Sequence, residues 1–248
     1  MDRRIGITGA NGTIGGVLAA GLGDDCEIVG FDREEGPRTA FVVDFAEAGQ
    51  VQGIFEGLDA VIHLAADPSP GAAWASVRDN NIEATYRVFE ECRNSGVERI
   101  VFATTNHTQH GDTIATTPET LDPAKRRHLR LTAPPNPDSL YAVSKLFGEN
   151  LGRYFSERHG LRFIGLRIGW ITKQNDAALK RGTPAEDYMR AMHLSHRDCV
   201  QAFRRALEVD ARFLLAYAIS ANDRRVFDLG DTVAGLGFAP RDNAETDF

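Results

Sequence analysis

The sequence predicts an α/β fold in which helices cover both faces of a doubly wound parallel sheet. Two observations carry this prediction. Short apolar runs alternate with amphipathic stretches through the first two-thirds of the 248 residues, as in consecutive strand–helix–strand units. The first apolar run passes directly into a glycine-rich turn, an order typical of doubly wound sheets. Hydrophobic residues make up 42% of the chain and charged residues 25%, so a folded globular protein is expected.

The strands and helices of this fold are expected in the following places. The strands are at residues 4–8, 27–32, 40–43, 60–64, 99–103 and 162–168. The helices between them are near residues 14–22, 46–55, 81–95 and 141–159. In the third helix, Ile82, Tyr86 and Phe89 recur at spacings of four and three, which gives that helix an apolar face for packing on a sheet.

Two later segments break this alternation. Residues 118–137 contain five of the ten prolines and part of them forms a basic run, 125–130, so we expect a long loop there whose role the sequence does not determine. Residues 169–248 contain one clear amphipathic helix, near 197–208. This segment is too short for a second full core, and we expect it to form a small lobe packed on the domain of residues 1–168.

Charge and composition exclude several classes of protein. The net charge is −7, whereas binding to nucleic acid or to an anionic membrane needs a basic surface. There is no apolar run of about 18 residues, and so no membrane span is expected. The first strand follows Met1 almost directly, without the apolar core of a signal peptide, and the three cysteines are widely spaced. These features predict a cytoplasmic protein with reduced thiols.

A glycine motif connects the first strand to the first helix. Gly9, Gly12 and Gly15 have the spacing G-x-x-G-x-x-G, a variant of the fingerprint that brings backbone and a helix N-terminus close to a dinucleotide pyrophosphate. Asp32 ends the second strand about 20 residues further on, where a carboxylate accepts hydrogen bonds from the ribose of NAD. It also repels the 2′-phosphate of NADP. NAD is therefore the expected cofactor. Arg33 weakens the repulsion, which makes this a preference for NAD over NADP.

Other residues are expected to surround the same cofactor. Asp44 can accept a hydrogen bond from the adenine amino group, and the small residues that end the fourth strand allow the cofactor to approach the backbone. The predicted cofactor-binding residues are Gly9, Asn11, Gly12, Thr13, Ile14, Gly15, Asp32, Arg33, Asp44, Phe45, Leu64, Ala65, Ala66, Asn81, Tyr141, Lys145 and Ile168. The alternative to a cofactor site is that this strand–turn–helix is purely structural and that Asp32 is a surface residue.

Tyr141 and Lys145 are the predicted catalytic pair. Residues four apart on a helix share a face. A free tyrosine, with a pKa near 10, is a poor base at neutral pH, and a nearby ammonium lowers that pKa. We therefore expect Tyr141 to take a proton from a substrate hydroxyl while hydride leaves the same carbon for the nicotinamide. Lys145 is also expected to hydrogen-bond the nicotinamide ribose.

The order of these motifs resembles a known family. It includes the glycine turn, Asp32, Leu64-Ala65-Ala66, Asn81-Ile82-x-x-Thr85, Thr104-Thr105, Tyr141-x-x-x-Lys145 and the closing Leu236-Gly237-Phe238-Ala239-Pro240. This order is similar to that of the extended short-chain dehydrogenases of the NAD-dependent epimerase/dehydratase family, over nearly the whole chain. The resemblance implies a Rossmann-type dinucleotide-binding domain in residues 1–168 and a small C-terminal substrate lobe in residues 169–248. It also implies a homodimer formed through the helices around Asn81 and Tyr141.

The segment from Phe102 to His107 narrows the resemblance. It is similar to the matching segment of uronate dehydrogenases and of the archaeal NAD-dependent glucose-6-phosphate dehydrogenase; residues 65–70, 194–199 and 219–224 also resemble the archaeal enzyme. This implies oxidation of a cyclic sugar at its anomeric carbon to a lactone. Thr105 then has the position of the catalytic residue that binds the reacting oxygen, and Asn106 and His107 have positions that bind sugar hydroxyls.

The sequence departs from these enzymes where they hold the acidic group of the sugar. Tyr188 falls at the position nearest to the family's arginine, and Arg190, two residues later, is the expected substrate-binding residue. Trp170 replaces a small polar residue of the uronate enzymes. The substrate therefore stays open between a hexuronate, a hexose 6-phosphate and a neutral aldose.

Two other functions are compatible with the same motifs. A sugar-nucleotide epimerase or dehydratase usually needs a larger C-terminal lobe, and a cofactor-sensing regulator often lacks the tyrosine or the lysine. No metal site is expected. His107 with His110, and His193 with His196, lack further ligands at useful spacing.

Overall fold

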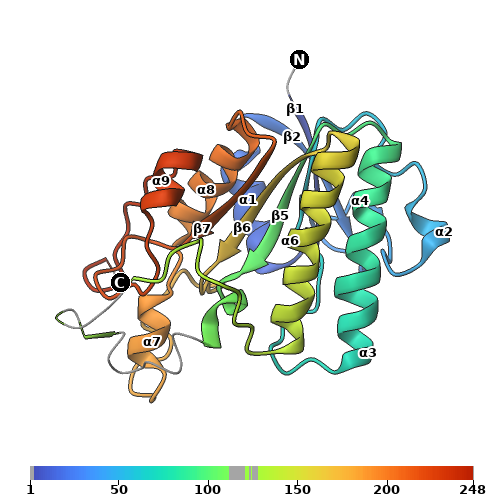
Figure 1. Cartoon of the computed structure of the whole chain (residues 1–248). Helices are drawn as coiled ribbons and strands as arrows, with labels where there is room; N and C mark the ends of the chain where they lie inside the picture. Colours follow the sequence, from blue (N-terminus) through green and yellow to red (C-terminus); the bar gives the residue numbers. More distant parts are fainter. Residues whose placement is uncertain (1–2, 112–120, 123, 125–127, 248) are drawn as a thin grey trace.

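The computed structural model describes residues 3–111, 121–122, 124 and 128–247. Of the basic run at 125–130, residues 125–127 lie outside this part. The described chain contains a seven-stranded parallel sheet in the order β3-β2-β1-β4-β5-β6-β7, shown in Figure 1. The strands are β1 (Arg3–Thr8), β2 (Cys26–Asp32), β3 (Phe41–Val42), β4 (Ala60–His63), β5 (Arg99–Thr105), β6 (Arg162–Ile168) and β7 (Phe213–Ala218).

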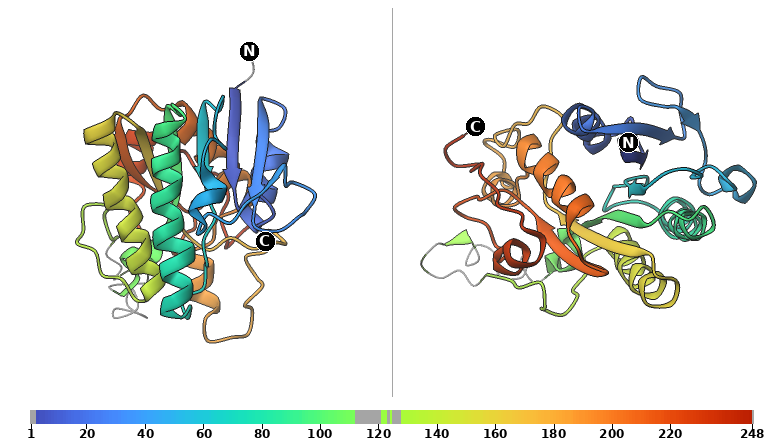
Figure 2. Two further views of the ribbon diagram at one scale, coloured as in Figure 1. Left: turned by 90° about the vertical axis from the view of Figure 1, so that its right-hand side faces the viewer. Right: turned by 90° about the horizontal axis from the view of Figure 1, so that it is seen from above.

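Helices cover both faces of this sheet (Figure 2). On one face, α1 (Thr13–Leu22) and α8 (His196–Glu208) bury Leu18 and Phe203 against the strands. On the other face, α4 (Ala84–Asn94) and α6 (Leu140–His159) bury Phe89 and Phe155 among other phenylalanines. The central strands β4, β5 and β6 are buried from both sides, which explains why they are apolar runs, whereas β3, at the edge of the sheet, is exposed. The predicted α/β fold is confirmed.

The ends of α6 follow from its sequence. Ser139 caps the first turn, where its hydroxyl accepts a hydrogen bond from the backbone N–H of Ala142 at 3.2 Å. Gly160 ends the helix in the left-handed conformation, at φ 76°, which only glycine adopts without strain. The helix therefore begins one residue before Tyr141 and carries both predicted catalytic side chains.

A buried ion pair attaches α6 to the sheet. The carboxylate of Glu149 accepts hydrogen bonds from Arg167 on β6, at 2.9 Å and 2.8 Å, and from the hydroxyl of Thr104 on β5, at 2.8 Å. The side chains of Arg167 and Glu149 are only 4% and 5% exposed. Three hydrogen bonds thus satisfy the two oxygens of this buried carboxylate.

The structure contains elements that the sequence did not predict. These are β7, α3 (Trp74–Val77), α7 (Glu186–Ala191), α9 (Gly230–Leu236) and a π-helical segment, η1 (Arg78–Glu83), that leads into α4. The helix expected at residues 46–55 is wrong in extent, since only α2 (Ala48–Val51) is helical. Gly53, at φ 76°, stops it.

The segment after residue 168 does more than form a lobe. It supplies β7 to the sheet and α8 to one of its helical layers, while α9 lies beside these two elements and α7 lies below them in Figure 1. The division of the chain at residue 168 stays a prediction. None of the described helices is long and apolar enough to cross a membrane.

Candidate active site

The carboxyl ends of β1, β2 and β4 open into a cleft of about 820 Å³. β2 and β3 lie on one side of β1, and β4 to β7 lie on the other, so the strand order reverses between β1 and β4. Ligands of doubly wound sheets bind at this point. Most of the predicted cofactor residues line the cleft: Gly9, Asn11, Gly12, Thr13, Ile14, Gly15, Asp32, Arg33, Asp44, Phe45, Leu64, Ala65 and Ala66.

The glycine turn lets the start of α1 pack closely against the end of β1. Gly9 is in the left-handed region, at φ 71°, and a Cβ on Gly15 would lie 2.5 Å from the carbonyl oxygen of Ala10. The residue before α1, Gly12, is its N-cap and provides no side-chain hydrogen bond to the first turn. The first N–H groups of α1 therefore have no partner inside the helix and favour an anion. This arrangement fits the pyrophosphate of a dinucleotide.

Asp32 is held at the edge of the cleft. Its Oδ2 accepts the backbone N–H of Asn11 at 2.8 Å, and the Asn11 side chain donates to the hydroxyl of Thr39 at 2.7 Å. Arg33 donates to the side-chain oxygen of Asn80 at 3.3 Å. Asp32 and Arg33 thus lie together at the cleft, as the predicted recognition of the adenosine ribose requires.

Several lining residues were missed by the sequence reasoning. They are Val43, Asp67, Pro68, Ser76, Asn80, Ala84 and Ile171. The signal for two of them was present, since Ser76 and Asn80 are four residues apart and therefore share a helical face. Asp67 accepts the Ser76 hydroxyl at 2.5 Å, which attaches the loop after β4 to this face.

Asn81 does not line the cleft. Its side-chain oxygen accepts the backbone N–H of Asp67 at 2.8 Å, and its amide donates to the carbonyl of Asp67 and to the hydroxyl of Ser144, both at 3.1 Å. Asn81 therefore joins the loop that forms one wall of the cleft to α6. The structure thus gives Asn81 a supporting contact, and its predicted contact with the cofactor stays a prediction.

Besides Asn81, three of the predicted cofactor residues are not part of the lining: Tyr141, Lys145 and Ile168. Tyr141 lies in the first turn of α6, and Thr105, the last residue of β5, is hydrogen-bonded to its phenol. The ammonium of Lys145, one turn further, is 5.8 Å from the centre of the Tyr141 ring. The predicted catalytic residues Thr105, Tyr141 and Lys145 are thus neighbours.

Burial dominates the acid–base properties of this group. It raises the pKa of Tyr141 to about 12, against a smaller lowering by the hydrogen bond with Thr105. It also lowers the pKa of Lys145 to about 7. The expectation that Lys145 lowers the pKa of Tyr141 is therefore wrong for the structure as described. Removal from water disfavours both the phenolate and the ammonium.

The predicted sugar-binding residues follow Thr105. Asn106 and His107 belong to the short helix η2 (Asn106–Thr108), and the backbone N–H of His107 donates to the Thr105 hydroxyl at 3.2 Å. The His107 ring lies edge-on to the Tyr141 ring, with 6.1 Å between their centres. Asn106 is buried, and a quarter of the His107 side chain is exposed. His107 is thus positioned beside the phenol and is open to solvent.

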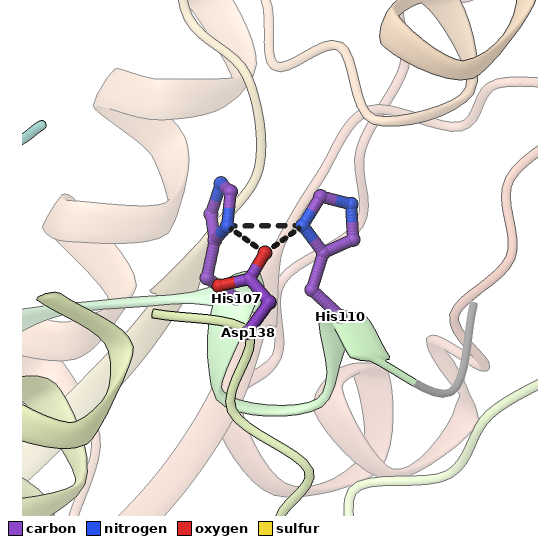
Figure 3. A group of neighbouring side chains, drawn as sticks. All are labelled: His107, His110 and Asp138. Atoms are coloured by element: carbon purple, nitrogen blue, oxygen red, sulfur yellow. Dashed lines mark hydrogen bonds and ion pairs between the residues drawn. The ribbon is translucent and has the colours of Figure 1, made fainter. Parts of the chain in front are cut away.

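The segment before α6 provides a carboxylate that contacts two histidines. Oδ2 of Asp138 lies 2.7 Å from Nδ1 of His107 and 2.9 Å from Nδ1 of His110 (Figure 3). Burial raises the pKa of Asp138, but hydrogen bonds from His107 and Ser139 outweigh burial and hold that pKa below its usual range. Among the described residues, this is the one group of three potential metal ligands.

Arg190 has other partners than the predicted sugar. Its guanidinium lies 3.6 Å from the carboxylate of Glu245 and 4.0 Å from that of Glu186, and the side chain is 14% exposed. Tyr188, on the same helix α7, stacks on His110 with 4.9 Å between ring centres. Tyr188 is therefore the side chain of α7 that contacts the histidine pair. The contacts of Arg190 do not support its predicted role in substrate binding.

Comparison with known proteins gives consistent matches. A model of the NAD dependent epimerase/dehydratase family matches residues 5–171. The chain is 41% identical to the L-arabinose 1-dehydrogenase (NAD(P)(+)) of Haloferax volcanii, over 98% of each protein. It is 35% identical to the NAD-dependent glucose-6-phosphate dehydrogenase of the same organism, over 98% of this chain and 95% of that protein.

A solved structure is similar over nearly the same length. It is a mutant of uronate dehydrogenase from Agrobacterium tumefaciens complexed with NAD, and it matches with a TM-score of 0.80 and 30% identity. The match covers 98% of this chain and 86% of that chain.

Proposed function

The chain belongs to the NAD-dependent epimerase/dehydratase family, and from this premise we propose that it oxidises a neutral cyclic aldose at its anomeric carbon to the lactone. The predicted family, the NAD cofactor and the oxidoreductase class are confirmed by the family match and by full-length relatives that are NAD(P)-dependent sugar dehydrogenases. The identity of the sugar and the roles of the individual residues belong to the proposal.

The arrangement of Thr105, Tyr141 and His107 at the end of β5 carries this proposal. Thr105 binds the anomeric oxygen, and Tyr141 takes its proton while the C1–H bond breaks. When bound, NAD supplies the hydride acceptor and a positive charge that favours the phenolate. Lys145, one turn further along α6, hydrogen-bonds the nicotinamide ribose. Asn106 and His107 hold ring hydroxyls.

The contacts of Arg190 support a neutral sugar. A carboxylate or phosphate on the substrate needs a cation to replace its water. Arg190 is paired with Glu186 and Glu245, and Tyr188 takes the place beside His110. The relative with 41% identity is named for a neutral pentose, which agrees with this choice.

A panel of sugars tests the proposal. Neutral pentoses and hexoses, hexuronates and hexose 6-phosphates are each supplied with NAD, and NADH formation is followed. We expect the highest kcat/KM with a neutral aldose, and trapping of the product by hydroxylamine as expected for a lactone. A higher value with a hexuronate or a sugar phosphate contradicts the neutral pocket. Conversion of a sugar nucleotide without net NADH favours the epimerase alternative.

Asp32 is expected to set the preference for NAD. Asp32→Asn removes the charge that repels a 2′-phosphate but keeps an oxygen for the N–H of Asn11. The ratio of kcat/KM with NAD to that with NADP should fall by about 10- to 100-fold, because a hydrogen bond to a charged group is worth about 1.5–3 kcal/mol. Glu35→Gln, an exposed neighbour, is the control. An unchanged ratio in Asp32→Asn contradicts the ribose contact.

A homodimer is also part of the proposal. The helices α4 and α6 lie side by side (Figure 1) and expose Tyr86, Val143 and Tyr154 by 40%, 47% and 53%. We expect light scattering after gel filtration to give twice the 27.2 kDa of one chain. The double variant Tyr86→Glu/Tyr154→Glu should halve this mass, whereas Val233→Glu, an exposed apolar position on α9, should not. A monomeric wild type contradicts the interface.

A further inference from the structure

Asp138 connects two histidines beside the catalytic tyrosine. His107 and His110 come from the turn after β5, whereas Asp138 precedes α6 (Figure 3). One carboxylate oxygen, Oδ2, lies within hydrogen-bond distance of Nδ1 of both rings, at 2.7 Å and 2.9 Å. The two rings are perpendicular, with 4.3 Å between their centres. They therefore approach the same oxygen from different directions.

These contacts determine which ring nitrogen carries the hydrogen. A neutral imidazole has one N–H and one lone pair, and an ionised carboxylate only accepts hydrogen bonds. A lone pair on Nδ1 would face the oxygen of Asp138 at 2.7 Å, which is repulsive. Nδ1 of His107 also lies 2.9 Å from Nδ1 of His110, but its contact with Asp138 is the shorter of the two and favours the hydrogen of His107 on Nδ1, with the lone pair on Nε2.

The carboxylate itself is fixed. Its other oxygen, Oδ1, accepts the hydroxyl of Ser139 at 2.8 Å, and Ser139 caps the helix that carries Tyr141. Only 17% of the Asp138 side chain is exposed. His110, which stacks on Tyr188, holds Oδ2 from the second side. The orientation of His107 is thus attached to the frame of the catalytic helix.

We propose that Asp138 is a positioning residue that keeps His107 in the Nδ1–H form, so that Nε2 accepts a hydrogen bond from a sugar hydroxyl next to the reacting carbon. The part that concerns the sugar rests on the proposed function. The hydrogen position on His107 is a property of the protein alone. The two parts can therefore fail separately.

The first test measures the hydrogen position. Long-range ¹H–¹⁵N NMR of the ¹⁵N-histidine-labelled protein, treated with EDTA, distinguishes a protonated from an unprotonated ring nitrogen, and His107→Gln identifies the signals. We expect a protonated Nδ1 and an unprotonated Nε2 in the wild type, and a mixture of both forms in Asp138→Ala. A wild-type ring protonated on Nε2 overturns the proposal. Stoichiometric Zn²⁺ that shifts Nδ1 of both rings also overturns it, because the three groups are then metal ligands.

The second test is kinetic. Asp138→Ala should lower kcat/KM for the preferred sugar by about 10- to 100-fold, the loss of a buried hydrogen bond to substrate, and leave NAD affinity unchanged. Asp138→Asn, which keeps an oxygen acceptor, should recover part of this loss. Asp210→Asn, a carboxylate 93% exposed and outside the site, is the matched control. Unchanged kcat/KM in Asp138→Ala overturns the proposal. If the wild type oxidises no sugar, the proposed function fails, while NMR still decides on Asp138.

Discussion

Replacing Tyr141 by phenylalanine is expected to lower kcat/KM by about 100- to 10,000-fold, the range that a positioned acid–base group contributes. The change removes only the phenolic oxygen, so the ring keeps its contacts with His107 and Lys145. NAD binding should be retained, because Tyr141 does not line the cofactor cleft. Steady-state kinetics with the preferred sugar and fluorescence titration with NADH measure the two quantities.

Tyr154→Phe is the matched control for this variant. It also removes a phenolic hydroxyl from α6, at a side chain that belongs to the proposed dimer interface and not to the catalytic group. It should have wild-type kcat/KM. Turnover in Tyr141→Phe that matches this control would mean that another group takes the proton. In the wild type, the rate should rise with pH, since burial raises the pKa of Tyr141 and the phenolate is the active base.

Glu149→Ala is expected to lower the free energy of unfolding by about 3–5 kcal/mol, the usual cost of removing one partner from a buried ion pair. The guanidinium of Arg167, 4% exposed, would lose both hydrogen bonds to the carboxylate, and the hydroxyl of Thr104 would lose its acceptor. Urea denaturation followed by circular dichroism measures the change.

An exposed ion pair on the same helix provides the comparison. Glu157 lies 3.8 Å from Arg153, and both side chains are more than half exposed. Glu157→Ala should cost less than about 1 kcal/mol, because solvent screens such a pair. In contrast, Glu149→Leu combined with Arg167→Met should recover much of the stability lost in Glu149→Ala. Equal losses in Glu149→Ala and Glu157→Ala would contradict the role of the buried pair.

The sequence predicted the sheet well because buried parallel strands are continuous apolar runs. All six predicted strands are present, and only their ends differ. The missed strand β7, Phe-Leu-Leu-Ala-Tyr-Ala, has no β-branched residue, and leucine and alanine favour helix. The short helices α7 and α9 are stabilised by tertiary packing, and their local patterns are too brief to predict.

In the candidate site, the sequence predicts the residues whose positions follow from their spacing along the chain. The glycine turn and Asp32 belong to one strand–helix–strand unit, so their spacing predicts their position in the cleft. Asp138 approaches His107 and His110 only through the packing of α6 beside β5. No spacing along the chain shows this. The prediction that the pKa of Tyr141 is lowered was wrong for the same reason, since burial is a property of the fold.

The hydrogen bonds of Asn81 all lie on the cofactor side of the active region. Asn81 fastens the wall of the cofactor cleft to α6 at Ser144, and none of its hydrogen bonds involves the turn after β5 or the helix α7. We therefore expect substitutions of Tyr188, on α7, to change the preferred sugar without disturbing the wall of the cofactor cleft. In that case, the residues proposed to hold the cofactor and those proposed to hold the sugar can be varied independently.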